Sequence, residues 1–87
     1  MLELTLFNDP GHAWLQVPRK IMRNVYVSQP FDISSYSYWD GGFFYLEEDV
    51  DMPAFLESAK AVGLSHYIIQ SEHGEFVRSL QRTKKTN

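Results

Sequence analysis

The chain of 87 residues contains no cysteine, which excludes a disulfide framework and any metal site built on thiolates. Long apolar runs are also missing, since no window approaches the roughly 20 apolar residues that cross a bilayer. Residues 1–6 lack the basic segment and long apolar core of a signal peptide. We therefore expect a cytoplasmic protein that makes no use of a membrane.

Positive charge is scarce. Eleven Asp and Glu residues outnumber eight Lys and Arg residues, which gives a formal net charge of -3. Because nucleic-acid binding depends on several clustered cations, we do not expect direct binding to nucleic acid. The cations gather in segments 19–23 and 78–85. We expect residues 1–82 to form one domain and residues 83–87 to be a disordered basic tail.

Hydrophobic alternation and turn signals predict an α+β fold in the order ββαββαβ. Leu2, Leu4 and Leu6 alternate with polar residues, as in a half-buried strand. Asp-Gly-Gly at 40–42 separates two aromatic runs, which is typical of a hairpin. The expected elements are strands over 2–6 and 13–17, a helix from 18 to 22 or 25, strands over 35–39 and 43–46, a helix over 52–62 and a strand over 64–70. Segment 76–80 is either a sixth short strand or one helical turn. About five strands would form a small antiparallel or mixed sheet with two helices on one face.

Three residues are candidates for acid–base or anion-binding chemistry. His12 follows the turn at 8–11, and a second imidazole is supplied by His73. Arg78 could clamp an anion, and Glu47 or Asp49 could serve as the base. The alternative is that both histidines are ordinary loop residues. No nucleophile elbow, phosphate-binding glycine loop or paired-cysteine motif occurs, so no reaction is fixed.

Four carboxylates crowd the junction between the strand at 43–46 and the following helix: Glu47, Glu48, Asp49 and Asp51. They could hold a divalent cation, but no calcium-loop spacing is present, and we predict neither a metal site nor a cofactor. Asp51, two residues before Pro53, is predicted to cap the helix. The others would then form a solvated acidic face.

The segment Ser-Ser-Tyr-Ser-Tyr-Trp at 34–39 alternates small polar with aromatic residues. Such a strand could stack nucleic-acid bases, or it could supply one buried face of a sheet. The absence of interleaved lysine or arginine favours the buried face. Tyr38, Trp39 and Asp40 would then lie beside the acidic residues.

Four segments, 9–18, 33–38, 45–49 and 76–80, carry a resemblance. In this order they resemble a set of short uncharacterised proteins of bacteria, phages and plasmids with the pattern DPGHAWL, YLEED and FVRSL. The resemblance covers most of the chain and implies a setting, accessory cargo of mobile genetic elements, without an activity. That pattern often has a cysteine where this chain has Val50, and several histidines where only His73 stands here.

This setting and the clustered charge lead us to expect a small non-enzymatic binding protein. The most specific version of this hypothesis is an inhibitor of a host defence complex, like an anti-CRISPR protein. The expected partner-binding residues are Glu47, Glu48, Asp49 and Asp51 with Tyr38, Trp39 and Asp40, which would imitate nucleic-acid phosphate in a partner's basic groove. The alternative is a histidine-dependent or metal-dependent hydrolase using His12 and His73. The protein would be a monomer or a homodimer.

Overall fold

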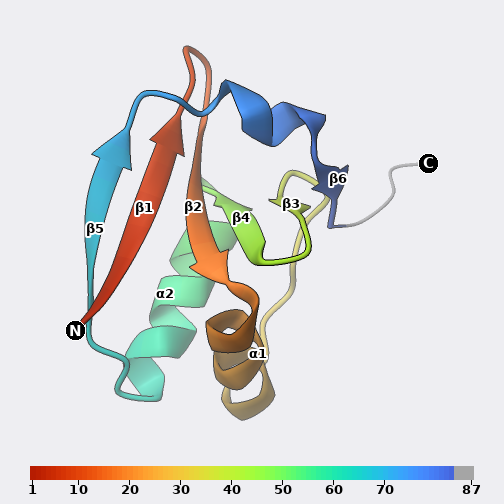
Figure 1. The fold of residues 1–87 in the computed structure, drawn as a ribbon. Coiled ribbons are helices and arrows are strands. Elements are labelled where there is room, and N and C mark those ends of the chain that lie inside the picture. The colour runs from red at the N-terminus through yellow and green to blue at the C-terminus, as the bar shows by residue number, and fades with distance from the viewer. Residues whose placement is uncertain (84–87) are drawn as a thin grey trace.

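A six-stranded mixed sheet forms the centre of the fold (Figure 1). The computed structural model describes residues 1–83. The strands are β1 (Leu2–Asn8), β2 (Ala13–Pro18), β3 (Tyr38–Trp39), β4 (Phe43–Glu47), β5 (His66–Ser71) and β6 (Gln81–Arg82). They lie in the order β5-β1-β2-β4-β3-β6. β1 and β5 are parallel, whereas the other neighbouring pairs are antiparallel.

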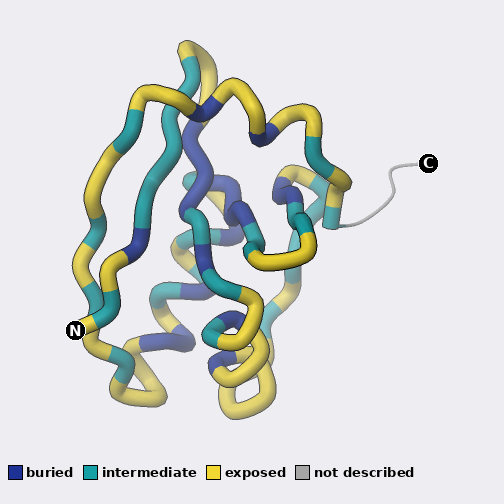
Figure 2. Tube along the Cα trace, viewed as in Figure 1, coloured by how far each residue is buried: buried dark blue, intermediate teal, exposed yellow. Residues whose placement is uncertain are grey.

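Two helices, α1 (Arg19–Ser28) and α2 (Asp51–Ala61), pack on one face of this sheet (Figure 1). Alternate strand residues point to that face, and they include Leu4, Leu15 and Leu46, all of which are buried. Met22 of α1 and Phe55 of α2 close the same core. Figure 2 shows the buried positions concentrated along β2, β4 and the inner sides of the helices.

A smaller core lies on the opposite face of the sheet. There, Trp14, Tyr38 and Tyr45 pack with Val77, which comes from the 3₁₀ helix η1 (Glu75–Ser79). Phe76 of η1 meets the Tyr45 ring edge-on at a centroid distance of 5.5 Å. The C-terminal part of the chain therefore covers one end of the sheet face that the helices leave open.

The predicted α+β class, with two helices on a mixed sheet, is confirmed. The sheet has six strands instead of about five because residues 81–82 pair with β3. Segment 76–80 forms a helical turn, and α1 continues to Ser28, beyond the predicted helix end at 22 or 25. Only Tyr38–Trp39 of the predicted strand at 35–39 is paired, since residues 34–37 instead hydrogen-bond to side chains and to the end of the chain.

The prediction that Asp51 caps α2 is wrong. Asp51 is the first helical residue, and its fully buried carboxylate accepts hydrogen bonds from the hydroxyls of Ser34 and Ser37 and from the Ser34 N–H. The carboxylate of Glu47 instead organises the approach to the helix, because it accepts from the N–H groups of Asp49 and Val50 at 3.0 Å. Gly63, directly after the helix predicted over 52–62, has a φ of 76°, the left-handed conformation that commonly ends a helix.

Thr83, predicted to begin the tail, hydrogen-bonds to the described fold. Its N–H donates to the Ser37 carbonyl at 3.0 Å and its hydroxyl to the Ser34 carbonyl at 2.6 Å. The rest of the predicted tail, 84–87, lies outside the described residues. Within residues 1–83, neither helix is long and apolar enough to cross a bilayer.

Candidate functional site

A cleft of about 260 Å³ opens on the η1 face of the sheet, beside the turn between β1 and β2. We call it the arginine cleft. Its walls come from segments far apart in the sequence: His12, Trp14, Tyr36, Tyr38, Glu47, Asp49, Val50, Arg78 and Arg82. Five of the predicted site residues are among them, namely two catalytic candidates and three partner-binding candidates. The fold therefore brings together residues that the sequence spreads over 71 positions, from 12 to 82.

Strand register positions the floor of the arginine cleft. Trp14 of β2 lies opposite Glu47 of β4, and Tyr38 of β3 lies opposite Arg82 of β6. Residues directly opposite each other in an antiparallel pair project from the same face of the sheet. The indole N–H of Trp14 also donates to the Tyr36 carbonyl at 3.3 Å, which fixes the loop above the floor.

Arg78 is held in place from two sides. Its guanidinium centre lies 5.2 Å from the centroid of the Trp14 ring, and its Nε donates to Asp9 Oδ2 at 2.7 Å. That hydrogen bond is the main reason why the pKa of Asp9 falls to about 2, although desolvation opposes the shift. N–H groups of Gly11 and His12, which donate to Asp9 Oδ1, lower the pKa further. The same contact raises the pKa of Arg78, so this ion pair stays charged at neutral pH.

Arg82 is held in the same manner. Its guanidinium centre lies 5.2 Å from the Tyr38 ring centroid, and one terminal nitrogen donates to the Ser35 carbonyl at 2.8 Å. A guanidinium has five N–H donors, and within residues 1–83 each of these two arginines uses one in a side-chain hydrogen bond. Both groups are thus oriented while most of their donors stay available to a ligand.

His12 is exposed at the rim of the arginine cleft, with its ring centroid 5.9 Å from that of Trp14. His73 is also exposed. It lies at the same end of the sheet, since the N–H of neighbouring Gly74 donates to the Asn8 carbonyl at 2.9 Å. It does not line the cleft. The structure therefore joins His12 with Arg78 and leaves His73 outside. Within residues 1–83, no group of three His, Asp or Glu side chains could hold a metal ion.

The predicted acidic surface is reduced by burial. Glu47 is 5% exposed and Asp51 0%, and their carboxylates accept hydrogen bonds from the backbone and from serine hydroxyls. Glu48 is half-buried, and of the four residues only Asp49 is fully exposed. Glu47 and Asp51 therefore hold the loops before α2, and of the two only Glu47 also lines the arginine cleft.

The three predicted neighbours of that acidic surface are divided between the two faces of the sheet. Tyr38 is buried in the smaller core. Trp39 instead stacks on Phe44 on the helix side of the sheet, with the two ring centroids 6.5 Å apart. Asp40 forms the β3–β4 turn by accepting from the N–H groups of Gly42 and Phe43, both at 2.9 Å. Desolvation raises the pKa of Asp40, but these hydrogen bonds outweigh it and the net shift is downward.

Four residues of the arginine cleft were not predicted as site residues: Trp14, Tyr36, Val50 and Arg82. Trp14 and Tyr36 belong to segments predicted as strands, where aromatic residues are ordinary core formers. Arg82 was grouped with the basic end of the chain. Nothing local in the sequence predicts that β6 pairs with β3 and so carries Arg82 to Tyr38.

Comparison of the chain with protein-family models, with curated proteins and with solved structures finds no significant match. The chemistry of the arginine cleft is therefore the best guide to function. Two oriented guanidiniums beside an imidazole form a set of hydrogen-bond donors suited to an oxyanion such as phosphate or carboxylate.

Proposed function

We propose that the protein is a non-enzymatic binding protein and that the arginine cleft recognises an oxyanion carried by its partner. The observation that carries this proposal is the pair of guanidiniums, Arg78 and Arg82, each fixed over an aromatic ring and by one hydrogen bond. Groups held in place before binding lose little conformational entropy when the ligand arrives.

The lining of the cleft supports a ligand with an anionic head on a flat or apolar body. Trp14, Tyr36 and Tyr38 supply aromatic surface beside the two arginines. Two carboxylates also line the cleft: Glu47 accepts hydrogen bonds from the N–H groups of Asp49 and Val50, and Asp49 is exposed and would disfavour a second negative charge on the ligand. A volume of about 260 Å³ accommodates a single group such as a phosphorylated or carboxylated side chain.

The predicted acidic interface does not carry this proposal, since Glu47 and Asp51 are buried. The predicted setting, an inhibitor of a host defence complex encoded by a mobile element, rests on the resemblance of the sequence and stays a prediction. It is compatible with binding through the arginine cleft, because such a partner would only need to present one accessible oxyanion.

Titration with phenyl phosphate, benzoate and neutral benzyl alcohol tests the proposal. Heteronuclear NMR spectra at constant ionic strength should show saturable shifts of the Trp14 and Arg82 side-chain signals with one or both anions, and none with the alcohol. Arg82→Gln should weaken binding by about tenfold, the effect of losing one charged contact. The control, Arg23→Gln, changes an exposed arginine of α1 that does not line the arginine cleft and should have no effect. Shifts that fail to saturate, or that Arg82→Gln leaves unchanged, would exclude oxyanion recognition here.

The alternative, a hydrolase, is favoured by one observation, the exposed imidazole of His12 beside Arg78. It requires His12 to act as general acid or base on a bound ester. A phosphodiester such as bis-nitrophenyl phosphate would then be cleaved, and His12→Ala would abolish cleavage while binding of phenyl phosphate persisted. The binding proposal predicts that neither the wild-type protein nor His12→Ala cleaves the phosphodiester.

A further inference from the structure

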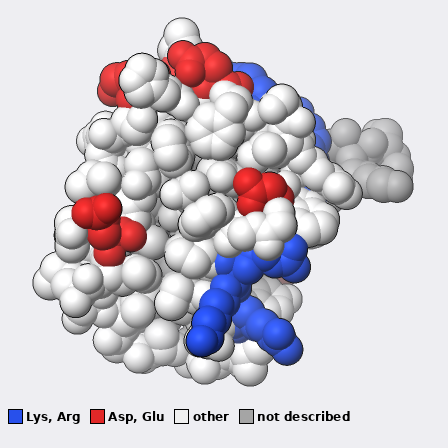
Figure 3. All heavy atoms as spheres, viewed as in Figure 1, with Lys and Arg blue, Asp and Glu red and all other residues white. Residues whose placement is uncertain are grey.

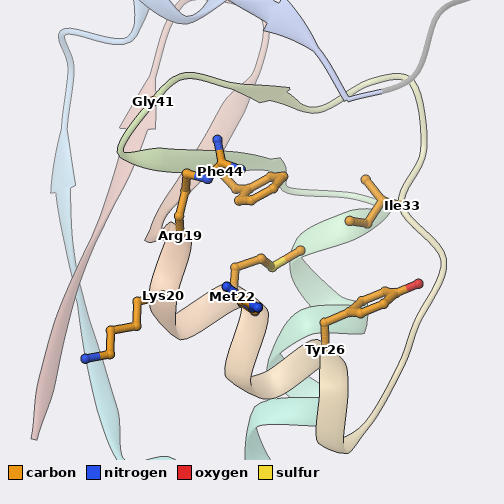
Figure 4. A pocket seen from close by; sticks show the side chains of 8 residues that line it. Arg19, Lys20, Met22, Tyr26, Ile33, Gly41 and Phe44 are labelled. Carbon is orange, nitrogen blue, oxygen red and sulfur yellow. The ribbon is translucent and has the colours of Figure 1, made fainter.

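A second hollow lies on the opposite side of the sheet, between α1 and the β3–β4 hairpin, and it has a volume of about 690 Å³. We call it the α1 groove. Its lining includes Arg19, Lys20, Arg23, Met22, Tyr26 and Phe44. Figure 4 shows Met22, Phe44 and Ile33 converging on the hollow, whereas Lys20 extends away from it at the rim. The groove thus has an apolar floor and a cationic wall.

Within the described part of the fold the cations of α1 make no ion pair, but Arg19 lies close enough to Asp40 to help lower the pKa of that carboxyl. Between residues 1 and 83, the one ion pair joins Arg78 and Asp9, so no carboxylate pairs with the cations of α1. On the face drawn in Figure 3, Lys and Arg side chains gather over α1 and the neighbouring hairpin, with one acidic patch directly above them and the other acidic patches farther away. Positive charge is therefore concentrated here despite the net charge of -3.

The guanidinium of Arg19 lies over two aromatic rings. Its centre lies 5.0 Å from the Trp39 ring centroid and 5.7 Å from that of Phe44. An adjoining hollow shares Arg19, Tyr26 and Phe44 with the α1 groove and extends it to Trp39. Aromatic residues and arginine next to each other are the composition enriched at interaction hot spots.

These charges also lower the stability of the helix that carries them. Arg19 and Lys20 occupy the first turn of α1, where the helix dipole is positive, and that turn contains no acidic residue. Each such cation is unfavourable at this end of a helix. Both side chains are exposed, and Arg19 also packs over the Trp39 and Phe44 rings. An anionic ligand would offset this repulsion.

We propose that the α1 groove binds an acidic, amphipathic segment of a partner protein, with carboxylates on the cationic wall and apolar side chains on Met22 and Phe44. A protein segment is favoured over nucleic acid for two reasons. Three cations neutralise few phosphates, and the apolar floor formed by Met22 and Phe44 offers contacts to hydrophobic side chains that a phosphate backbone lacks. This proposal is independent of the arginine cleft, which lies on the other face.

Selection from a display library of random peptides tests the proposal. Peptides enriched on the wild-type protein should combine at least two Asp or Glu residues with aromatic or aliphatic residues. The variant Arg23→Glu should reduce their binding by about tenfold, and Arg19→Glu/Arg23→Glu should abolish it. The matched control Lys60→Glu reverses an exposed charge on α2, outside the groove, and should retain binding.

Three results would overturn the proposal. The first is that no peptide is enriched over a carrier without the protein. The second is that the enriched peptides lack carboxylates or bind Arg23→Glu as well as wild type. The third is that a pool of random single-stranded oligonucleotides, tested in parallel, is retained in a groove-dependent manner while acidic peptides are not. Because both arginines are exposed, circular dichroism is expected to show an unchanged fold for every variant.

Discussion

Asp9 is the residue whose ionisation the fold changes most clearly. The pKa of its carboxyl is lowered from 3.8 to about 2, first by the hydrogen bond from Arg78 and then by two backbone N–H groups. Because the pKa is lower in the folded protein, the ionised carboxyl stabilises the fold at pH values above 3.8, the pKa in the unfolded chain. This stabilisation is lost as the pH falls through about 2. The contact between Asp9 and Arg78 therefore persists through the physiological pH range.

The substitution Arg78→Gln should raise the pKa of Asp9 toward 3.8, because the strongest stabilising partner of the carboxylate is removed. Acid unfolding should consequently begin at a higher pH than in the wild type. Titration of the carboxyl carbon by NMR measures the pKa directly. The matched variant Arg82→Gln should leave the Asp9 pKa unchanged, and an equal shift in both variants would show that Arg78 is not the cause.

Gly74 marks the closest approach between two chain segments. A Cβ atom at this position would lie 2.7 Å from the carbonyl carbon and oxygen of Asn8, with no flexible side chain to yield. Gly74→Ala should therefore destabilise the fold by about 1–3 kcal/mol. Gly41→Ala is the control, since nothing lies within 4 Å of its added Cβ, and thermal unfolding should distinguish the two. Equal melting temperatures would contradict this packing.

At the scale of elements, the loop before β3 depends on α2. The buried carboxylate of Asp51 binds Ser34 and Ser37, and Ser37 in turn accepts from the Glu47 N–H at 2.9 Å. Asp51→Ala would leave these donors unpaired, and it should lower the free energy of unfolding by about 3 kcal/mol. Asp49→Ala, two residues earlier and exposed, should change it by no more than ~0.5 kcal/mol. Chemical denaturation checks both values, and comparable losses would disprove the structural role of Asp51.

The first turn of α1 allows stability and binding to be separated. Lys20→Glu replaces an exposed cation near the positive end of the helix dipole by an anion, and should stabilise the protein by about 0.3–1 kcal/mol. The same change should weaken the binding of acidic peptides to the α1 groove. Unfolding and peptide binding measured on one preparation test both effects. A destabilised variant would mean that Lys20 serves the fold itself.

Most elements of the fold follow from local signals. Alternating leucines predict β1, the Asp-Gly-Gly turn predicts the β3–β4 hairpin, and the apolar spacing with Gly63 predicts α2. The buried role of Asp51 was not predictable, because an acidic residue before a proline at a helix start is ordinarily a cap. Its actual partners, Ser34 and Ser37, lie 17 and 14 residues away, and only the packed structure identifies them.

At the scale of the whole molecule, sequence reasoning found part of the candidate site but not its arrangement. His12 and Arg78 were predicted together, and they do line one cleft. Trp14, Tyr36, Val50 and Arg82 complete it. The pairing of β2 with β4 and of β3 with β6, which depends on contacts distant in sequence, places Trp14 and Arg82 there. The two faces of the sheet then separate the tryptophans, with Trp14 at the arginine cleft and Trp39 beside the α1 groove.

This separation gives the most direct test of the central claim, because the chain contains two tryptophans and hence two indole N–H signals. Phenyl phosphate should be titrated into the wild-type protein while both signals are followed by NMR, with Trp39→Phe used to assign them. The account predicts that the Trp14 signal shifts and saturates while the Trp39 signal stays in place. Equal, non-saturating movement of both signals, or movement of Trp39 alone, would contradict recognition of an oxyanion by the arginine cleft.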